Sequence, residues 1–288
     1  MKILVQFSGG KDSLATLIWA KKEFGNNIKA VFCDTLWEHE LTYSHIQDVI
    51  EKMGIELVNL KSEKYDGFMD MAKKKNRFPS TKARFCTEEL KVKPFIDYVL
   101  SLNEDVLIIQ GIRADESLSR SKMQNQCSYF KFYFEPFGID KNGKNKTYSY
   151  RKPEVRIFKK MYSDDVLRPI FEWNVKQVFD YIKENGFEPN ELYKRGFSRV
   201  GCMPCIMARK SEVKAILDYE PEYFDRIVEA EKEVGRTFFP PSYIPSHACG
   251  KRQFATAKEV QKYVEGKNET VNMFEQNMNC SSVYSLCE

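Results

Sequence analysis

The residues best suited to chemistry form a short loop near the start of the chain, Ser8-Gly9-Gly10-Lys11-Asp12-Ser13. An apolar run precedes this loop, and a segment whose apolar residues have helical spacing follows it. Adjacent glycines let a backbone approach a ligand closely, and the N–H groups at a helix N-terminus attract an anion. Lys11 adds a full positive charge, while Asp12 and Ser13 can cap the helix or face a metal. The pattern predicts phosphate binding, and its alternative is an ordinary capped strand–turn–helix.

The spacing of this loop excludes two common phosphate-binding sequences. A Walker A loop places four residues between its glycines and ends in Gly-Lys-Ser/Thr. The dinucleotide fingerprint needs three glycines in the order Gly-x-Gly-x-x-Gly. Neither pattern is present at Ser8–Ser13.

Four cysteines form the second group of candidates. Cys202 and Cys205 have a spacing that lets two thiols bind one metal or cluster, although a thioredoxin-like redox pair has the same spacing. Cys86 stands at an expected helix start, where a thiolate is favoured. Together with Cys249 these residues would supply four ligands to an iron–sulfur cluster or a zinc ion. His247 and the other cysteines near the C-terminus compete with Cys249 for the fourth position.

The elements that must position these residues alternate between strand-like and helix-like patterns in the first half of the chain. This alternation predicts an α/β fold, a doubly wound, Rossmann-like parallel sheet. Expected strands are Ile3–Phe7, Ala30–Cys33, Glu56–Asn59 and Val106–Gln110. Expected helices are Asp12–Lys22, Leu41–Met53, Tyr65–Lys74 and Glu88–Leu102. Ligands bind beyond the carboxyl ends of such strands, where the Ser8–Ser13 loop, Asp34 and Gly111-Ile112-Arg113 all fall.

The second half of the chain is less regular. Residues 124–160 are aromatic and basic, and Asn142-Gly143 predicts the turn of an inserted β-hairpin. Its aromatic and lysine side chains could grip a single strand of nucleic acid, but packing against the domain is the favoured role. Further helices are expected at Val175–Asn185, at Lys210–Val234 with a break near Pro221, and at Lys258–Glu265.

Composition narrows the class of protein. The chain has 288 residues, 42% of them hydrophobic, which suits one large domain with an appendage. We expect a nucleotide-binding domain over residues 1–235 and a cysteine-bearing C-terminal extension over 236–288. The net charge of +4 argues only weakly for nucleic acid. No signal peptide or membrane-spanning stretch is evident, and eight cysteines in such a chain predict a reducing, cytoplasmic location.

The loop resembles the PP-loop of the adenine nucleotide alpha hydrolases, and residues 1–235 resemble one branch of them, the phosphoadenosine phosphosulfate reductase family. The stretches that carry the resemblance are Ser8–Ser13; Asp34-Thr35 with Glu38-His39 and Thr42-Tyr43; Arg84-Phe85-Cys86-Thr87 with Leu90-Lys91 and Pro94; Gly111-Ile112-Arg113 with Glu116-Ser117 and Arg120; Pro169-Ile170-Phe171-Glu172-Trp173; Leu192-Tyr193; and Gly201-Cys202 with Cys205.

The resemblance implies a role for each matched position. The loop would hold the phosphates of ATP, and Asp34 would approach the ribose or adenine. Gly111, Arg113 and Arg120 would adjoin the anionic groups of the nucleotide, although an ion pair with a nearby carboxylate is the alternative for both arginines. Cys86, together with the Cys-x-x-Cys pair, resembles the 4Fe-4S ligands of the iron–sulfur reductases.

The chain departs from the reductases of this family in two places. They usually have an altered loop, whereas this chain keeps Lys11 and Asp12. They also carry a nucleophilic cysteine in a C-terminal Glu-Cys-Gly motif, whereas this chain ends Leu286-Cys287-Glu288. The departures favour the members of the superfamily that use ATP, such as the sulfur transferases that thiolate DNA or tRNA.

We therefore expect an ATP pyrophosphatase that activates an acceptor for sulfur chemistry. Lys11, Asp12 and Arg113 would be catalytic, with Mg²⁺ bridging the phosphates. Expected partners are a sulfur donor protein or thioredoxin, with nucleic acid as an acceptor only weakly supported. One alternative is a sulfonucleotide reductase with Cys280 or Cys287 as nucleophile. Another is a non-catalytic nucleotide-binding partner subunit.

Overall fold

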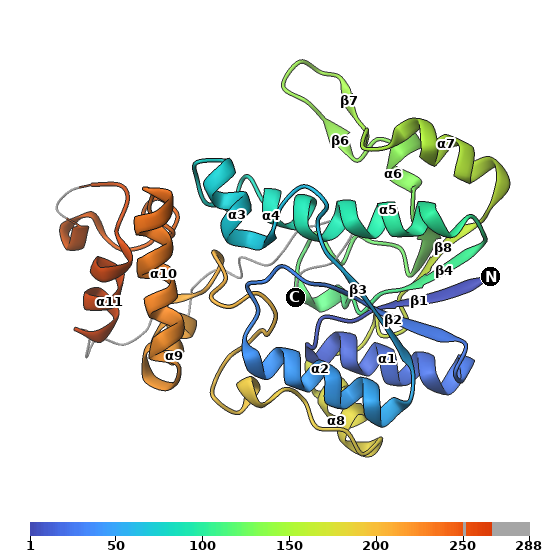
Figure 1. Cartoon of the computed structure of the whole chain (residues 1–288), viewed down its shortest axis with the longest axis horizontal. Coiled ribbons are helices and arrows are strands. Elements are labelled where there is room, and N and C mark those ends of the chain that lie inside the picture. The colour runs from blue at the N-terminus through green and yellow to red at the C-terminus, as the bar shows by residue number, and fades with distance from the viewer. Residues whose placement is uncertain (250–251, 267–288) are drawn as a thin grey trace.

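A computed structural model of the chain describes residues 1–249 and 252–266 (Figure 1). Its main sheet consists of β1 (Lys2–Gln6), β2 (Ile28–Cys33), β3 (Glu56–Leu60), β4 (Val106–Ile109), β5 (Gln126–Ser128) and β8 (Asp164–Leu167). The strand order is β3-β2-β1-β4-β8-β5. All neighbouring pairs are parallel except β5 and β8, which are antiparallel. The expected parallel sheet is confirmed, with an antiparallel edge strand that the sequence did not predict.

Helices cover both faces of this sheet, as expected for a doubly wound fold. On one face lie α1 (Lys11–Phe24), α2 (Glu40–Met53) and α8 (Val175–Glu184), and on the other lie α5 (Lys93–Leu102) and α7 (Lys152–Met161) (Figure 1). Alternate residues of β1 point to opposite faces, because side chains alternate along a strand. Ile3 and Val5 pack in the core with α1, α2 and α8, whereas Leu4 packs in the core with α5.

Two segments differ from the expected elements. The helix expected over Glu88–Leu102 is preceded by a short helix, α4 (Phe85–Thr87), and opens with a π-helical turn, η1 (Glu88–Val92), before α5. The expected hairpin is present as β6 (Gly138–Ile139) and β7 (Asn145–Lys146). It lies between α6 (Lys131–Phe134) and α7, and neither helix was predicted.

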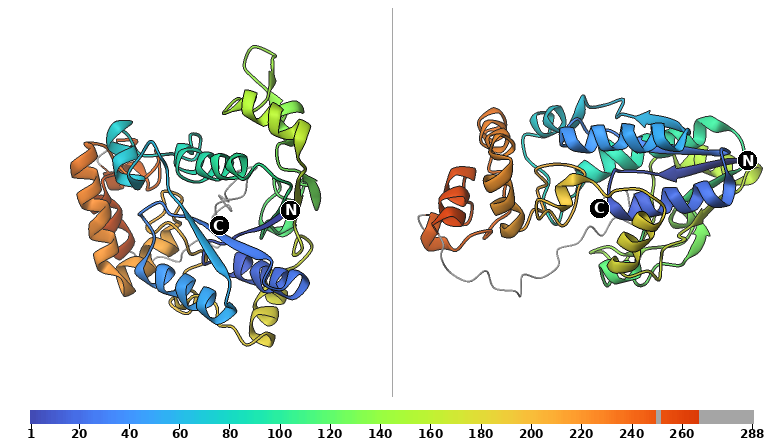
Figure 2. Two further views of the ribbon diagram at one scale, coloured as in Figure 1. Left: turned by 45° about the vertical axis from the view of Figure 1, so that its right-hand side comes forward. Right: turned by 90° about the horizontal axis from the view of Figure 1, so that it is seen from below.

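A third core lies beyond the carboxyl edge of the sheet, at the end of the molecule far from the N-terminus (Figure 2). It is built by α3 (Gly67–Lys74), α9 (Lys210–Tyr219), α10 (Pro221–Val234) and α11 (Ala257–Glu265). The expected break before Pro221 is confirmed. Phe238 and Phe239 are buried in this core beside Phe68 of α3, so residues on both sides of the expected boundary at 235/236 pack together. The division into domains stays a prediction.

No helix within residues 1–249 or 252–266 is long and apolar enough to cross a membrane. Cys280 and Cys287, the candidate nucleophiles of the reductase alternative, lie outside the described residues.

Candidate nucleotide and cysteine site

The loop between β1 and α1 has a conformation that requires glycine. Gly9 has a φ of +80°, a value that side-chain-bearing residues rarely adopt. A Cβ at Gly9 would lie 3.0 Å from Cγ2 of Thr42, so α2 packs directly against the loop. Ser13 holds the loop closed, because its hydroxyl donates to the Gly10 carbonyl at 3.0 Å and accepts from the Ser8 amide at 3.2 Å.

Gly111, which follows β4, brings a second strand end against this loop. A Cβ at Gly111 would lie 2.8 Å from the carbonyl oxygen of Asp12 and 2.9 Å from the amide nitrogen of Ser13. A side chain at Gly111 would therefore meet backbone atoms of Asp12 and Ser13, which cannot move aside as the end of a flexible side chain can. The close approach places Arg113, two residues further along, beside the start of α1.

Asp12 connects two cations at the start of α1. Its carboxylate is fully buried, with one oxygen 2.9 Å from Lys11 Nζ and the other 2.7 Å from Arg113 Nε. Burial alone would lower the pKa of the Arg113 guanidinium, but the carboxylates of Asp12, Glu116 and Asp115 outweigh it and raise that pKa. Arg113 is therefore a fixed cation, and Asp12 holds it beside Lys11.

Arg120 is connected to Arg113 through Glu116. Its guanidinium is buried and pairs with Glu116, which also accepts the backbone amide of Arg113 at 3.0 Å. Both arginines thus form the ion pair that the sequence left open as an alternative, Arg113 with Asp115 and Arg120 with Glu116. The role of each toward a substrate stays a prediction.

Tyr193 contacts the loop from a distant part of the chain, a contact that no local sequence pattern predicted. It ends the 3₁₀ turn η3 (Glu191–Tyr193), and its hydroxyl accepts the backbone amide of Lys11 at 3.0 Å. The ammonium of Lys11 lies 5.5 Å from the centre of the Tyr193 ring, within range of a cation–π interaction. Only the family motif Leu192-Tyr193 pointed to this residue.

Asp34, expected near the ribose or adenine, follows the carboxyl end of β2. Its Oδ1 accepts the Tyr43 hydroxyl at 2.7 Å and the Leu36 amide at 2.9 Å, which fixes the carboxylate. Burial raises the pKa of Tyr43, and the carboxylates of Glu38 and Asp34 raise it further. Tyr43 therefore stays protonated and keeps Asp34 oriented.

Glu38 links this network to the cysteines. It is buried, and its carboxylate accepts the Thr35 hydroxyl at 2.7 Å and the Trp37 amide at 3.1 Å. The thiol of Cys202 lies 3.6 Å from Glu38 Oε1 and 3.5 Å from Thr35 Oγ1. The sequence had placed Glu38 only within a family motif, because its contact with Cys202 spans 164 residues.

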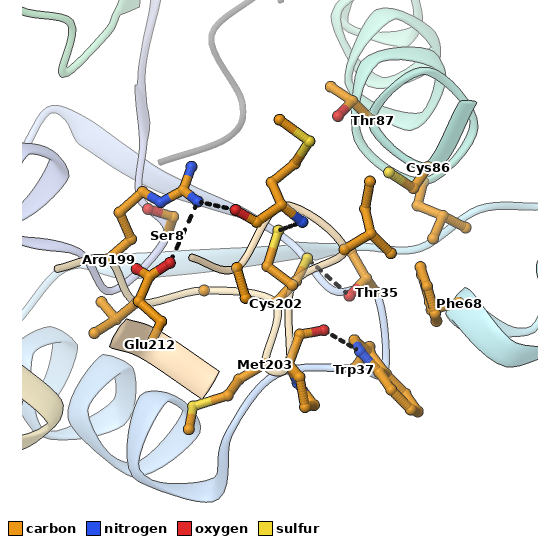
Figure 3. Close-up of a pocket in the computed structure, with 18 of the residues that line it drawn as sticks. Ser8, Thr35, Trp37, Phe68, Cys86, Thr87, Arg199, Cys202, Met203 and Glu212 are labelled. Carbon is orange, nitrogen blue, oxygen red and sulfur yellow. Dashed lines mark hydrogen bonds and ion pairs between the residues drawn. The ribbon is translucent and has the colours of Figure 1, made fainter. Parts of the chain in front are cut away.

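The Cys-x-x-Cys segment is docked onto the loop that follows β2. Glu38 and Cys202 form an isolated antiparallel bridge, and the Met203 amide donates to the Trp37 carbonyl at 2.8 Å. The Trp37 indole donates in turn to the Pro204 carbonyl at 2.8 Å (Figure 3). Three hydrogen-bonding contacts thus fix this segment next to the carboxyl end of β2.

Three of the four expected metal ligands meet at one pocket. Cys86, Cys202 and Cys205 line it together with Ser8 of the loop (Figure 3). The Met207 amide donates to the sulfur of Cys205 at 3.4 Å. The pocket is therefore shared by the cysteines and the phosphate loop.

Cys249 does not line this pocket, and its thiol donates to the Arg252 carbonyl at 2.9 Å. Over residues 1–249 and 252–266, no group of three or more His, Cys, Asp or Glu side chains is arranged to hold a metal ion. The side chains described here therefore do not fit a metal centre as they stand. The four-cysteine site stays a prediction, and no step proposed below depends on it.

His39, at the start of α2, joins the loop after β2 to α10. Its ring stacks on Tyr223 with centroids 4.0 Å apart, and its Nε2 lies 3.3 Å from a carboxylate oxygen of Glu220. Burial, and then the positive charge of Arg195, lowers the pKa of His39 to about 4. His39 is therefore neutral at neutral pH, and its Nδ1 accepts the Leu41 amide at 2.9 Å as a helix cap.

Two uncharacterized proteins are similar to this chain over most of its length. The chain is 31% identical to an uncharacterized 37.8 kDa protein of Escherichia phage 186, in an alignment that covers 89% of this chain and 84% of the phage protein. It is 30% identical to an uncharacterized protein of Methanocaldococcus jannaschii, over 78% of this chain but only 40% of that protein.

More distant matches have names that describe an activity. The chain is 25% identical to an adenosine 5'-phosphosulfate reductase of Oceanobacillus iheyensis, over 62% of this chain and 61% of that enzyme. Among solved structures, a phosphoadenylyl-sulfate reductase from Candida auris is similar with a TM-score of 0.47 and 18% identity, over 71% of this chain and 83% of that one. Residues 2–208 match the phosphoadenosine phosphosulfate reductase domain. The loop, the strand ends around it and this match together show that the chain belongs to the phosphoadenosine phosphosulfate reductase domain family.

Proposed function

We propose that the chain binds ATP at the Ser8–Ser13 loop and cleaves it between the α and β phosphates to activate an acceptor for sulfur chemistry. The observation that carries this proposal is the intact loop, in which Asp12 holds both Lys11 and Arg113 at the helix start. Two fixed cations and a helix N-terminus form a site for a polyphosphate.

Each residue has a distinct part in the reaction. Lys11 and the loop amides neutralise charge on the leaving pyrophosphate, and Arg113 faces the charge that develops on the α phosphate. Both oxygens of Asp12 already contact cations, so Asp12 acts as a positioning residue rather than a metal ligand. A bound Mg²⁺ would supply further positive charge to the phosphates.

The covalent step follows from this arrangement. An oxygen of the acceptor forms a bond to the α phosphorus, and the bond from that phosphorus to the α–β bridging oxygen breaks. Pyrophosphate leaves with the electron pair, and the acceptor is adenylylated. The cysteine pocket shares Ser8 with the loop, and this neighbourhood supports sulfur chemistry on the proposed product.

Pyrophosphate release from ATP, with water standing in for the acceptor, tests this proposal. We expect Lys11→Ala to lower the rate at least about a hundredfold, because removing a donor to developing charge costs roughly 10²–10³ in rate. Lys22→Ala is the matched control, since Lys22 is exposed further along the same helix. Equal rates for both variants would contradict the proposal.

A second candidate function is a sulfonucleotide reductase, and the relatives named adenosine 5'-phosphosulfate reductase favour it. A reductase would need Cys280 or Cys287 as nucleophile, whereas adenylylation does not. We expect Cys280→Ser and Cys287→Ser to leave pyrophosphate release unchanged. Thioredoxin-dependent sulfite release from adenylyl sulfate by the parent protein, lost in either variant, would favour the reductase instead.

A further inference from the structure

The segment Lys131–Lys160, here called the arm, has a charge unlike that of the rest of the chain. It comprises α6, the β6–β7 hairpin and α7, and the hairpin projects from the body of the molecule (Figure 1). The arm holds nine Lys and Arg residues against three Asp and Glu, a net charge of +6. The chain as a whole carries +4, so the remainder carries −2. The positive charge of the molecule is therefore concentrated in the arm.

Much of this charge is available to a partner. Lys141, Lys144 and Lys146 of the hairpin are exposed, as are Arg156 and Lys160 of α7. None of these five side chains forms an ion pair with any residue in 1–249 or 252–266. By contrast, Lys159 and Arg151 of the arm form ion pairs with Asp164 and Asp97, respectively.

The aromatic residues around the hairpin fall into two groups. Tyr129, Phe130 and Tyr133 are buried in the core with α5, which confirms packing against the domain for these three. Phe134 and Phe137 are instead 49% and 41% exposed. The Phe137 ring is partly covered, because it stacks on Tyr148 with centroids 4.7 Å apart. Packing therefore accounts for the first group and for part of Phe137, and it leaves the Phe134 ring facing solvent near the lysines.

The hairpin is a preformed projection. Asp140 Oδ1 accepts the backbone amides of Asn142 at 2.8 Å and Lys144 at 2.9 Å, and Gly143 supplies the positive φ of +78° that the turn requires. At the base, the Tyr133 hydroxyl donates to the Tyr150 carbonyl at 2.6 Å. The hairpin backbone that carries the lysines is thus shaped before any partner arrives.

We propose that the arm binds a single strand of nucleic acid. Lys141, Lys144 and Lys146 would contact backbone phosphates, while the exposed Phe134 ring offers a face on which an unpaired base stacks. A duplex keeps its bases stacked internally, so it cannot use this ring. An acidic protein surface would form ion pairs with the lysines, but it has no bases to stack on the exposed aromatic ring. The proposal does not depend on ATP cleavage at the loop.

Fluorescence anisotropy with a labelled 20-nucleotide oligo-dT, titrated at several salt concentrations, tests this proposal. We expect the triple variant Lys141→Gln, Lys144→Gln, Lys146→Gln to bind at least about tenfold more weakly. The slope of log affinity against log salt should become shallower by about 2, since each phosphate contact to a single strand contributes about 0.7. The matched control is Lys183→Gln, Lys232→Gln, Lys258→Gln, which removes the same charge from exposed lysines outside the arm and should change affinity less than twofold.

A second variant separates stacking from charge. Phe134→Ala should weaken oligo-dT binding about fivefold or more without changing the salt slope, because base–aromatic stacking does not release counterions. Circular dichroism on each variant checks that it is folded. Equal weakening by the arm and control triples, equal affinity for a duplex of the same length, or displacement of oligo-dT by polyglutamate at equal charge would each overturn the proposal.

Discussion

The phosphate loop and the cysteine pocket share Ser8, yet they are built in opposite ways. The loop is formed by six consecutive residues, and its internal hydrogen bonds join residues no more than five apart. The cysteine pocket combines α4, the loop after β2 and the segment around Cys202, and the contacts between the last two span 167 residues. The conformation of the phosphate loop is therefore set largely by local sequence, with Arg113 and Tyr193 added by the fold, whereas the cysteine pocket exists only once distant segments have come together.

The largest effect is expected if the cysteine pocket binds a metal. Cys202→Ser and Cys205→Ser should then each lose most of the bound metal and lower stability, because ligation free energy is also folding free energy. The measurement is metal content and visible absorbance of protein purified without oxygen, with brown absorbance for an iron–sulfur cluster and a colourless metal-bound protein for zinc.

Cys249→Ser is the informative comparison, because Cys249 does not line the pocket. Metal loss in this variant would support the four-cysteine set and would mean that Cys249 moves toward the pocket on binding. Unchanged metal content in all three variants would make the Cys-x-x-Cys pair a redox couple or part of the core.

Gly111→Ala should damage the loop while leaving the cysteine pocket in place. Its Cβ would meet Asp12 backbone at 2.8 Å, and overpacking of this kind costs about 1–3 kcal/mol. We expect lower stability in chemical denaturation and weaker ATP binding. Gly138→Ala is the control, since a Cβ there has no neighbour within 4 Å. Equal stability and ATP affinity for the two variants would argue against the close approach of β4 to the loop.

His39 provides a pH test of the joint between the loop after β2 and α10. Its folded pKa of about 4 lies below the ordinary value of 6.5, so the unfolded chain takes up the proton first as the pH falls. The stability that neutral His39 contributes is fully present above pH 6.5 and is lost as the pH falls toward about 4. His39→Asn, which keeps a helix-cap acceptor, should show a smaller loss of stability over this window in denaturation at a series of pH values. A loss equal to that of the parent protein would contradict the assignment.

Trp37→Phe should have the smallest effect and should be confined to the cysteine pocket. It removes the indole hydrogen bond to the Pro204 carbonyl, a loss of about 1 kcal/mol. Reaction of the pocket thiols with a chromogenic disulfide should become faster, while ATP affinity stays within about twofold. A large loss of ATP affinity would show that the two sites are not built independently.

The difference between the two sites explains what the sequence could predict. The Ser8–Ser13 loop, the parallel strands β1 to β4 and the hairpin turn at Asn142-Gly143 depend on neighbouring residues, so local patterns predicted them, whereas the parallel strand β8 was missed. Tyr193 and Glu38 could not be assigned contacts in this way, because each meets its partner across more than 160 residues. The antiparallel edge strand β5 also could not be predicted from local patterns, because it is only three residues long and is placed by pairing with β8.

Sequence patterns also could not show which carboxylates each arginine contacts. Arg113 and Arg120 have the same type of neighbourhood in the sequence, with carboxylates nearby. In the fold, Arg113 pairs with Asp12 of the loop in addition to its neighbour Asp115, whereas Arg120 pairs with Glu116. The distinction comes from the close backbone approach at Gly111, which brings only the first arginine to the start of α1.

Titration calorimetry of ATP against the parent protein and Lys11→Ala tests the central claim most directly. We expect Lys11→Ala to bind ATP at least about tenfold more weakly than the parent protein, because a charge-assisted contact contributes about 1.5–3 kcal/mol. Binding of AMP, which lacks the β and γ phosphates, should be weak in both proteins and nearly equal between them. ATP affinity that is the same in the parent and in Lys11→Ala would contradict the assignment of the Ser8–Ser13 loop as the phosphate site.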